Sequence, residues 1–181
     1  MIEKPVVRHD LGAAEIARLP GAIRDSRIQG LTLIRRSMSV GQTYSTESGA
    51  GVLLAWLDDV EVTLSLTPIE IYIPKEYPEG SCEYEALMDH EGGHVDVGSE
   101  AAAAAARNFE RAFSRAPELP SKERPLVANR RGEVVAALKR EVDDLLDPVY
   151  ERFEQDLARL QAERDQPAGY DYLFKRCSGW R

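Results

Sequence analysis

The pattern of apolar and polar residues divides the chain into a strand-rich part and a helical part. Between residues 31 and 74 the β-branched and aromatic residues cluster, and DDVEVTLSLTPIEIYIP alternates apolar with polar residues. This alternation is typical of half-buried strands and predicts three or four antiparallel strands. The polar segment QTYSTESGAG, residues 42–51, is expected to form a loop between them.

A long helix is predicted from Ser81 to about residues 114–117. Ser81 is a suitable N-cap, and Glu83 and Glu85 lie in the first turn, where carboxylates interact favourably with the helix dipole. Six consecutive alanines at 101–106 have the highest intrinsic helix propensity. The helix should therefore continue well beyond its first turns.

A second long helix is predicted over about residues 129–164. The segment before it, PELPSKERP, contains three prolines and cannot be helical throughout. Pro148 should kink the second helix. Its apolar stripe consists of Val134, Leu138, Val142, Leu145, Leu146, Phe153, Leu157 and Leu160.

These elements predict one α+β domain over residues 1–181, with a small antiparallel sheet followed by a long-helix hairpin. Its parts are a strand-rich region (30–80), the hairpin (81–165) and a tail (166–181) that packs back on the body. The segment AAEIARLP near the start of the chain offers only a short helical pattern.

The composition agrees with a folded globular chain, because 43% of the 181 residues are hydrophobic and 30% are charged. The formal net charge is −8 with no local basic patch, which argues against nucleic acid or an anionic membrane as a partner. The longest apolar run, residues 49–57, is too short for a membrane span. MIEKPVVRHDLG lacks the apolar core of a secretory signal, so a cytoplasmic and an exported location both stay open. No feature indicates the oligomeric state.

The motif with the clearest chemistry is His90-Glu91-Gly92-Gly93-His94, an H-E-x-x-H sequence inside the first predicted helix. Four residues advance a helix by about 400° and 6 Å, so both imidazoles project from nearly the same side and can share one Zn²⁺. Glu91 lies about 100° around the helix from His90, where its carboxylate can act as a general base towards an activated water. The alternative is that His90 and His94 are ordinary surface or hydrogen-bonded residues of an acidic helix.

The two glycines of the motif need an explanation, because two glycines inside a helix cost about 1–2 kcal/mol relative to alanine. One explanation is the close approach of a neighbouring strand, helix or substrate backbone. The other is local fraying of the helix.

A catalytic zinc site takes three protein ligands and leaves one position open. If the two long helices lie antiparallel about a midpoint near residue 121, the residues facing 90–94 fall at about 148–152. Glu151 lies in this window, with Asp147 one turn earlier, and Glu151 is the expected third ligand. The second helix is rich in acids, so a carboxylate opposite the histidines is also expected without any function.

Glu100 is a further candidate, because one large group of zinc peptidases has its third ligand six residues after the second histidine. That group turns the chain with a glycine three residues after that histidine, where this chain has Val97. If the helix continues, Glu100 lies about 15 Å along the axis from His90 and about 80° off its face. It is therefore expected to be a solvated side chain.

The only cysteines, Cys82 and Cys177, are too far apart in sequence to form a metal-binding knuckle. Cys82 begins the motif helix, and the tail after the returning helix could bring Cys177 back to it. A disulfide between them is the prediction, with two free thiols as the alternative. Such a bridge would bring Asp171 towards the motif as another candidate third ligand.

The chain resembles zincin-type metallopeptidases, and most closely a bacterial family of predicted secreted zinc-dependent proteases. The resemblance covers about residues 50–181 and rests on a strand region, EALMDHEGGHVDVGSEAAA, a long helical stretch, the pair Tyr170-Asp171 and Trp180. It implies a secreted zinc protease in the periplasm or outside the cell. In that family a histidine usually follows the Tyr-Asp pair, whereas YDYLFKR has none. This difference implies either an acid in that role or loss of turnover.

The leading functional expectation is a zinc-dependent metallohydrolase that cleaves a peptide or protein substrate. His90 and His94 bind Zn²⁺, Glu91 is the general base, and an edge of the sheet holds the extended substrate. The alternative is a non-catalytic helical binding module or envelope-associated structural module with a structural or vestigial metal. An amidase acting on cell-wall peptides would use the same chemistry as the peptidase.

Overall fold

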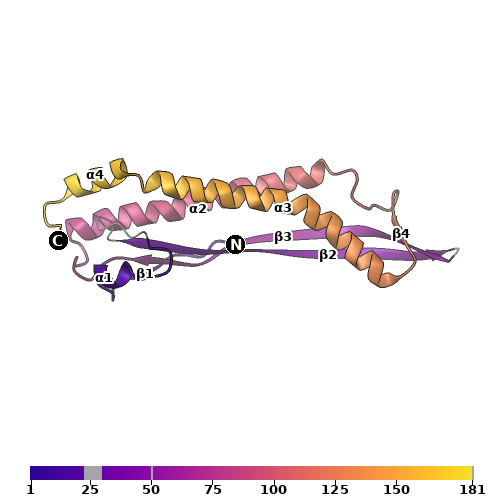
Figure 1. Cartoon of the computed structure of the whole chain (residues 1–181), viewed down its shortest axis with the longest axis horizontal. Helices are drawn as coiled ribbons and strands as arrows, with labels where there is room; N and C mark the ends of the chain where they lie inside the picture. The colour runs from indigo at the N-terminus through magenta and orange to yellow at the C-terminus, as the bar shows by residue number, and fades with distance from the viewer. Residues whose placement is uncertain (23–29, 50, 181) are drawn as a thin grey trace. The chain divides into compact units, whose positions relative to one another are not determined.

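The chain folds into a small mixed sheet and helices, which confirms the α+β class (Figure 1). This computed structural model describes residues 1–22, 30–49 and 51–180. The strands are β1 (Val6–Arg8), β2 (Leu31–Gly49), β3 (Val52–Tyr72) and β4 (Leu126–Ala128). The helices are α1 (Ala13–Ile16), α2 (Cys82–Ser114), α3 (Arg131–Arg164) and α4 (Pro167–Arg176).

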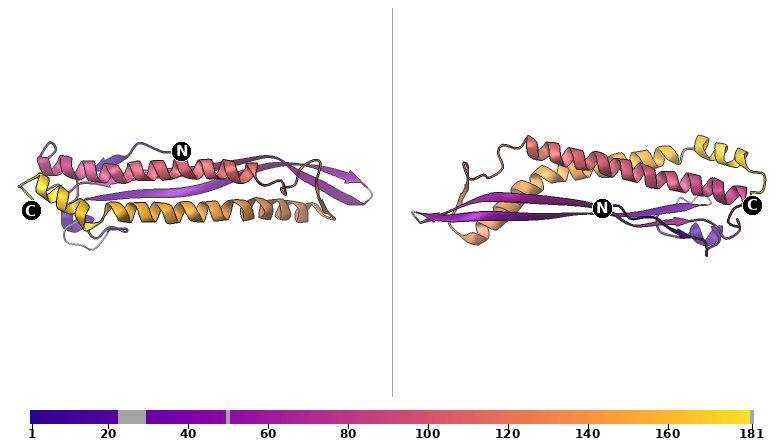
Figure 2. Two further views of the ribbon diagram at one scale, coloured as in Figure 1. Left: turned by 90° about the horizontal axis from the view of Figure 1, so that it is seen from above. Right: turned by 180° about the vertical axis from the view of Figure 1, so that it is seen from behind.

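The central strand of the sheet is β3, and the other long strand, β2, lies beside it (Figure 2). The strand order is β1-β3-β2, and β4 also pairs with β3. β1 runs parallel to β3, with Val6 opposite Glu70, whereas β4 runs antiparallel to it, with Ala128 opposite Leu53. The sheet is therefore mixed, and the expectation of a purely antiparallel sheet is corrected.

Two long strands replace the three or four that the pattern predicts between residues 31 and 74. The polar segment expected to be a loop belongs to β2 as far as Gly49, while residue 50 lies outside the described part of the chain. Polar residues extend as a strand here because β3 provides hydrogen-bonding partners for the backbone, whatever the side chains. The turn between the strands includes Gly51, whose φ of +81° favours glycine.

The helix boundaries follow the sequence closely. α2 begins at Cys82 after the predicted N-cap, and the Ser81 hydroxyl accepts the backbone N–H of Tyr84 at 3.2 Å. It ends at Ser114, within the predicted limits. α3 contains Pro148 in its interior and ends at Arg164, as expected, and the kink at Pro148 stays a prediction. Within the described chain, no helix has the length and apolar content to cross a membrane.

The contacts group into two compact units. Unit 1 comprises Met1–Ser37, Ser65–Ala101 and Gln155–Arg181, and unit 2 comprises Met38–Leu64 and Ala102–Glu154. Each unit draws on both the strand-rich and the helical parts of the chain, so neither is a continuous segment. The single domain over residues 1–181 stays a prediction.

Each unit has its own apolar core. In unit 1, the end of β3, the segment that follows it, the first turns of α2 and the C-terminal tail contribute buried side chains, and Trp180 packs against them. These are Ile71, Ile73, Tyr77, Ala86, Leu87, Leu173 and Cys177. In unit 2 one cluster of buried residues consists of Ala55, Val134 and Leu138, which β4 helps to cover. Burial of this apolar surface is the main stabilising contribution in both units.

Candidate metal site

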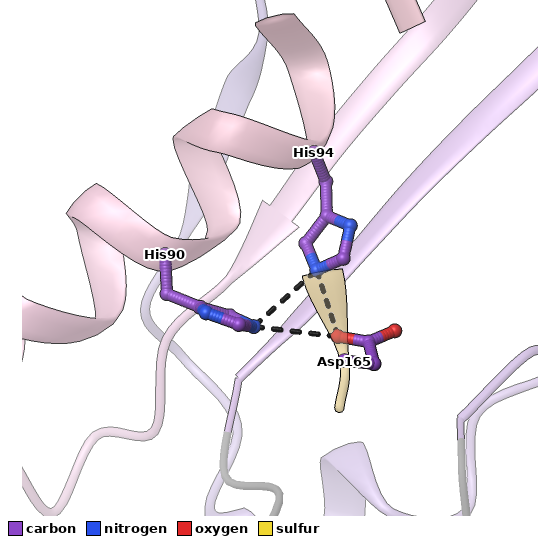
Figure 3. A group of neighbouring side chains, drawn as sticks. All are labelled: His90, His94 and Asp165. Atoms are coloured by element: carbon purple, nitrogen blue, oxygen red, sulfur yellow. Dashed lines mark hydrogen bonds and ion pairs between the residues drawn. The ribbon is translucent and has the colours of Figure 1, made fainter. Parts of the chain in front are cut away.

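Three side chains of unit 1 converge on one point (Figure 3). His90 and His94 project from the same side of α2, as the spacing predicts, and Asp165 directly follows the last residue of α3. The Oδ1 atom of Asp165 lies 3.3 Å from Nε2 of His90 and 3.0 Å from Nε2 of His94. The two Nε2 atoms are 3.3 Å apart. Each of the three residues thus offers one ligand atom to a common centre.

These distances suit a tetrahedral zinc site. Ligand atoms about 2.0–2.1 Å from Zn²⁺ at tetrahedral angles lie about 3.3–3.4 Å from one another. The three separations in the protein, 3.0, 3.3 and 3.3 Å, are close to this value. Two histidines and one carboxylate also form a ligand set of catalytic zinc, which leaves a fourth position open. The residues present therefore fit Zn²⁺ in both geometry and chemistry.

Gln161 orients the ring of His94. Its side-chain oxygen faces Nδ1 of His94, and its amide nitrogen donates to the backbone oxygen of the same residue at 3.0 Å. Because an amide oxygen only accepts hydrogen bonds, Nδ1 must carry the proton. The unprotonated Nε2 of His94 is then directed towards Asp165 and can bind a metal.

Burial lowers the pKa of His94, but hydrogen bonds to Asp165 and Gln161 outweigh it, and the net pKa is raised. When the His94 ring is charged, its second proton is on Nε2 beside Asp165, and a metal ion that binds Nε2 must displace this proton. The same negative charge that holds the proton also attracts a cation.

Glu91 is held beside this group but contributes no ligand atom to it. Its side chain is only 2% exposed, and the Thr32 hydroxyl lies 2.8 Å from its Oε2 and 3.0 Å from its backbone oxygen. A Cβ at Gly30 would lie 2.5 Å from Oε1, so the carboxylate fits closely against that glycine. Burial raises the pKa of Glu91, although both histidines and Thr32 lower it. A carboxylate with this environment suits a general base.

A cavity of about 410 Å³ opens beside the site. Glu91, His94 and Asp165 line it together with Gln161 and Thr32. The remaining wall is mainly apolar and comes from the start of β2 and the end of α3, through Leu31, Leu33, Ile34, Leu157 and Ala158. A substrate group in this cavity would lie against both the candidate ligands and the candidate base.

Glu151, the expected third ligand, is not a member of this group, and it belongs to unit 2. Glu151 is an exposed residue of α3, about fourteen residues and so about 21 Å along the helix axis before Asp165. Asp147 lies one turn earlier still and is exposed too. Asp165 takes the place that the sequence assigned to Glu151.

The error lies in the register between α2 and α3. Gln161 and Asp165 face the motif, rather than residues near 148–152. The midpoint of 121 assumes a symmetric connection, but the chain between the helices includes β4, which pairs with β3.

The other two candidates are also outside the group. Glu100 is exposed and lies on α2, which continues without a turn, as the helix geometry predicts. Asp171 is exposed on α4. Among the residues that the structure describes, the ligand group consists of His90, His94 and Asp165 alone.

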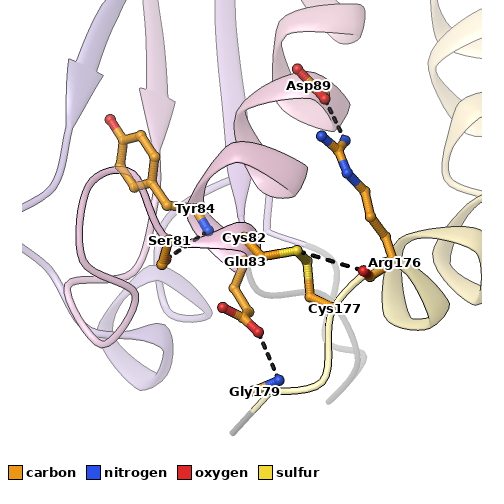
Figure 4. The surroundings of a disulfide bond; sticks show 8 residues. All are labelled: Ser81, Cys82, Glu83, Tyr84, Asp89, Arg176, Cys177 and Gly179. Atoms are coloured by element: carbon orange, nitrogen blue, oxygen red, sulfur yellow. Dashed lines mark hydrogen bonds and ion pairs between the residues drawn. A yellow bond between two sulfur atoms is a disulfide. The ribbon is translucent and has the colours of Figure 1, made fainter.

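The predicted disulfide between Cys82 and Cys177 is confirmed, with a Cα–Cα distance of 5.8 Å (Figure 4). Arg176 pairs with Asp89, and the backbone N–H of Gly179 donates to Glu83 at 2.7 Å. The tail thus packs on the first turns of α2, as expected, and it contains the helix α4.

The sequence reasoning missed Asp165, Gln161 and Thr32. The sequence contains one signal for Asp165. Pro167 marks the start of a new helix, so Asp165, two residues earlier, is expected to lie outside regular helix. No local pattern distinguishes Gln161 from other polar residues of α3, or Thr32 from other polar residues of β2.

No protein-family model, curated protein or solved structure matches the chain. Its function is therefore inferred from the site itself.

Proposed function

We propose that the protein is a zinc-dependent metallohydrolase that cleaves peptide bonds. The observation that carries this proposal is the convergence of His90, His94 and Asp165 at mutual distances of 3.0–3.3 Å. His90 and His94 are buried, and few functions other than metal binding need two imidazole Nε2 atoms so close together beside a carboxylate.

Zn²⁺ bound to these residues would supply Lewis-acid chemistry, polarising a substrate carbonyl and acidifying a water molecule. The chain's own contribution is Glu91, whose carboxylate accepts the proton of the attacking water and passes it to the leaving amine. Thr32 and Gly30 keep this carboxylate in place. Gln161 keeps His94 in the tautomer that binds metal.

Two features favour a catalytic role over a structural one. Structural zinc sites are closed by four protein ligands, whereas the group found in the described chain has three. The cavity also gives a substrate access to Glu91, His94 and Asp165. We also propose that the two long helices form a hairpin that carries the H-E-x-x-H motif.

A peptide substrate is supported by the start of β2. Leu31, Thr32, Leu33 and Ile34 line the cavity, and β2 is the outer strand in the order β1-β3-β2. An extended peptide can add to such an edge through main-chain hydrogen bonds. The disulfide supports an oxidising compartment, the periplasm or the exterior of the cell.

The test is zinc content after supplementation and dialysis, measured by elemental analysis. Wild type is expected to retain about one Zn²⁺ per chain, and His94→Ala and Asp165→Ala are expected to lose it. Glu151→Ala is the matched control, since it removes an exposed carboxylate of α3 and should retain the metal. A wild-type protein without zinc, or an Asp165→Ala variant that binds it as tightly, contradicts the proposal.

A further inference from the structure

We infer that Arg164 is a positioning residue for Asp165, and that residue 93 must be glycine to admit the Arg164 guanidinium. This inference rests on the proposed metal site. It assigns a function to one of the two glycines in H-E-G-G-H, which the chemistry of the motif alone does not explain.

The side chain of Arg164 lies directly on the motif turn. Its Nε donates to the backbone oxygen of His90 at 2.9 Å, and its Nη2 donates to the backbone oxygen of Asp89 at 3.2 Å. A Cβ at Gly93 would lie 1.8 Å from Nη2 and 1.9 Å from Cζ. Any side chain at position 93 would therefore displace the guanidinium from this position.

This contact bears directly on the ligand geometry, because Arg164 is the last residue of α3 and Asp165 is the next residue. Asp165 lies outside the helix, so α3 alone does not fix its position. The two hydrogen bonds attach the end of α3 to the very turn that carries His90. Gln161, one turn earlier, attaches to His94 in the same way. The distance from Asp165 to both histidines is thus set by these attachments.

The neighbouring Gly92 offers a contrast. A Cβ at Gly92 would meet no heavy atom within 4 Å. Both glycines carry the same cost in helix propensity, but only Gly93 has a neighbour that needs the space. Alanine at the two positions therefore separates the helix effect from the positioning effect.

The experiment compares the Zn²⁺ affinity of Gly93→Ala and Arg164→Met with that of wild type and the matched control Gly92→Ala. Competition with a chromogenic chelator provides the dissociation constants. Loss of a residue that orients a metal ligand typically weakens binding about 10–100-fold. We expect losses in this range for Gly93→Ala and Arg164→Met, and a change below about twofold for Gly92→Ala. Thermal unfolding of each apo variant checks that it folds.

Two further measurements identify positioning as the cause. If Gly93 only admits Arg164, Gly93→Ala should cause no additional loss in the Arg164→Met background. The visible absorption of the Co²⁺ protein should change in the same direction in Gly93→Ala and Arg164→Met, since both displace the same ligand, Asp165.

The inference is overturned if Gly93→Ala binds zinc as Gly92→Ala does. It is also overturned if Arg164→Met binds zinc more tightly, because the dominant effect of Arg164 would then be repulsion between its charge and the cation. A wild-type protein that binds no metal contradicts the proposed function instead, so the two failures are distinguishable.

Discussion

The cavity in unit 1 and the groove in unit 2 are similar in size but differ in what they can do. The groove has a volume of about 510 Å³ and is lined by Asp58, Asp59, Phe113, two prolines and further, mainly apolar residues. Its two carboxylates are exposed, and Asp58 accepts a hydrogen bond from Ser45 at 2.8 Å. In unit 1 the cavity reaches buried His94 and Glu91 and half-buried Asp165.

The comparison shows that carboxylates alone do not define a site in this chain. The chain has 31 Asp and Glu residues, and two of them line the groove of unit 2 without converging on a histidine. What distinguishes unit 1 is that three ligand atoms from two segments converge where water is largely excluded. Burial raises the cost of leaving such groups without a partner, so their convergence needs an explanation that exposed acids do not.

The largest effect expected in unit 1 is loss of activity in Glu91→Gln. Removal of a general base typically lowers the rate about 10²–10⁴-fold. The assay measures cleavage of a peptide library by the zinc-loaded protein, with zinc content measured in parallel. Glu85→Gln, an exposed change on the same helix, should leave the rate unchanged. Loss of zinc along with activity in Glu91→Gln would contradict the role of Glu91 as a base.

Removal of the disulfide should be the next largest effect. In the double variant Cys82→Ala and Cys177→Ala, the free energy of unfolding should fall by about 2–4 kcal/mol, because the bridge restrains the unfolded chain. Urea unfolding without reductant measures it. Hydrogen exchange should increase first in α4 and the first turns of α2, whereas the unit 2 core around Leu138 should keep its protection. Equal loss of protection in both cores would show that the two units unfold together.

Zinc binding should stabilise unit 1 in particular. A ligand that binds only the folded state at about 100 times its dissociation constant contributes about 2.7 kcal/mol. Thermal unfolding with and without chelator measures this difference, and hydrogen exchange locates it. Protection should increase around His90 and Gln161 and stay constant in β4. An increase centred on β4 would mean that the metal binds elsewhere.

The smallest effect is expected in the groove of unit 2. Asp59→Asn should change the zinc dissociation constant less than about twofold and the free energy of unfolding by less than about 0.5 kcal/mol, as is usual for exposed sites. The chelator competition and urea unfolding used above measure both quantities. A clear loss of zinc binding in Asp59→Asn would contradict the difference drawn between the cavity in unit 1 and the groove in unit 2.

The sequence predicted those features that neighbouring residues determine, and it did not predict those that depend on residues far apart in the chain. His90, Glu91 and His94 lie within one helical turn, so the helix period alone places them on α2. Asp165 follows His90 by 75 positions, and its place depends on the whole connection between α2 and α3. The acid-rich composition of α3 then offered Glu151 as readily as any other carboxylate.

The prediction of the strand region was limited by a different cause. Alternation identified β3 correctly as extended, but the polar end of β2 has no apolar pattern that would mark it as a strand. Its conformation comes from pairing with β3, which is a tertiary effect. The same limit applies to Thr32, whose role depends on Glu91 lying opposite.

The position of Asp165 also has a consequence for synthesis. The ribosome delivers His90 and His94 long before Asp165, and Cys177 later still. A nascent chain that ends before the α3–α4 junction has the two histidines but lacks the carboxylate that completes the group. The complete ligand group therefore forms only after almost all of this sequence has been translated, at the stage when the core of unit 1 can close.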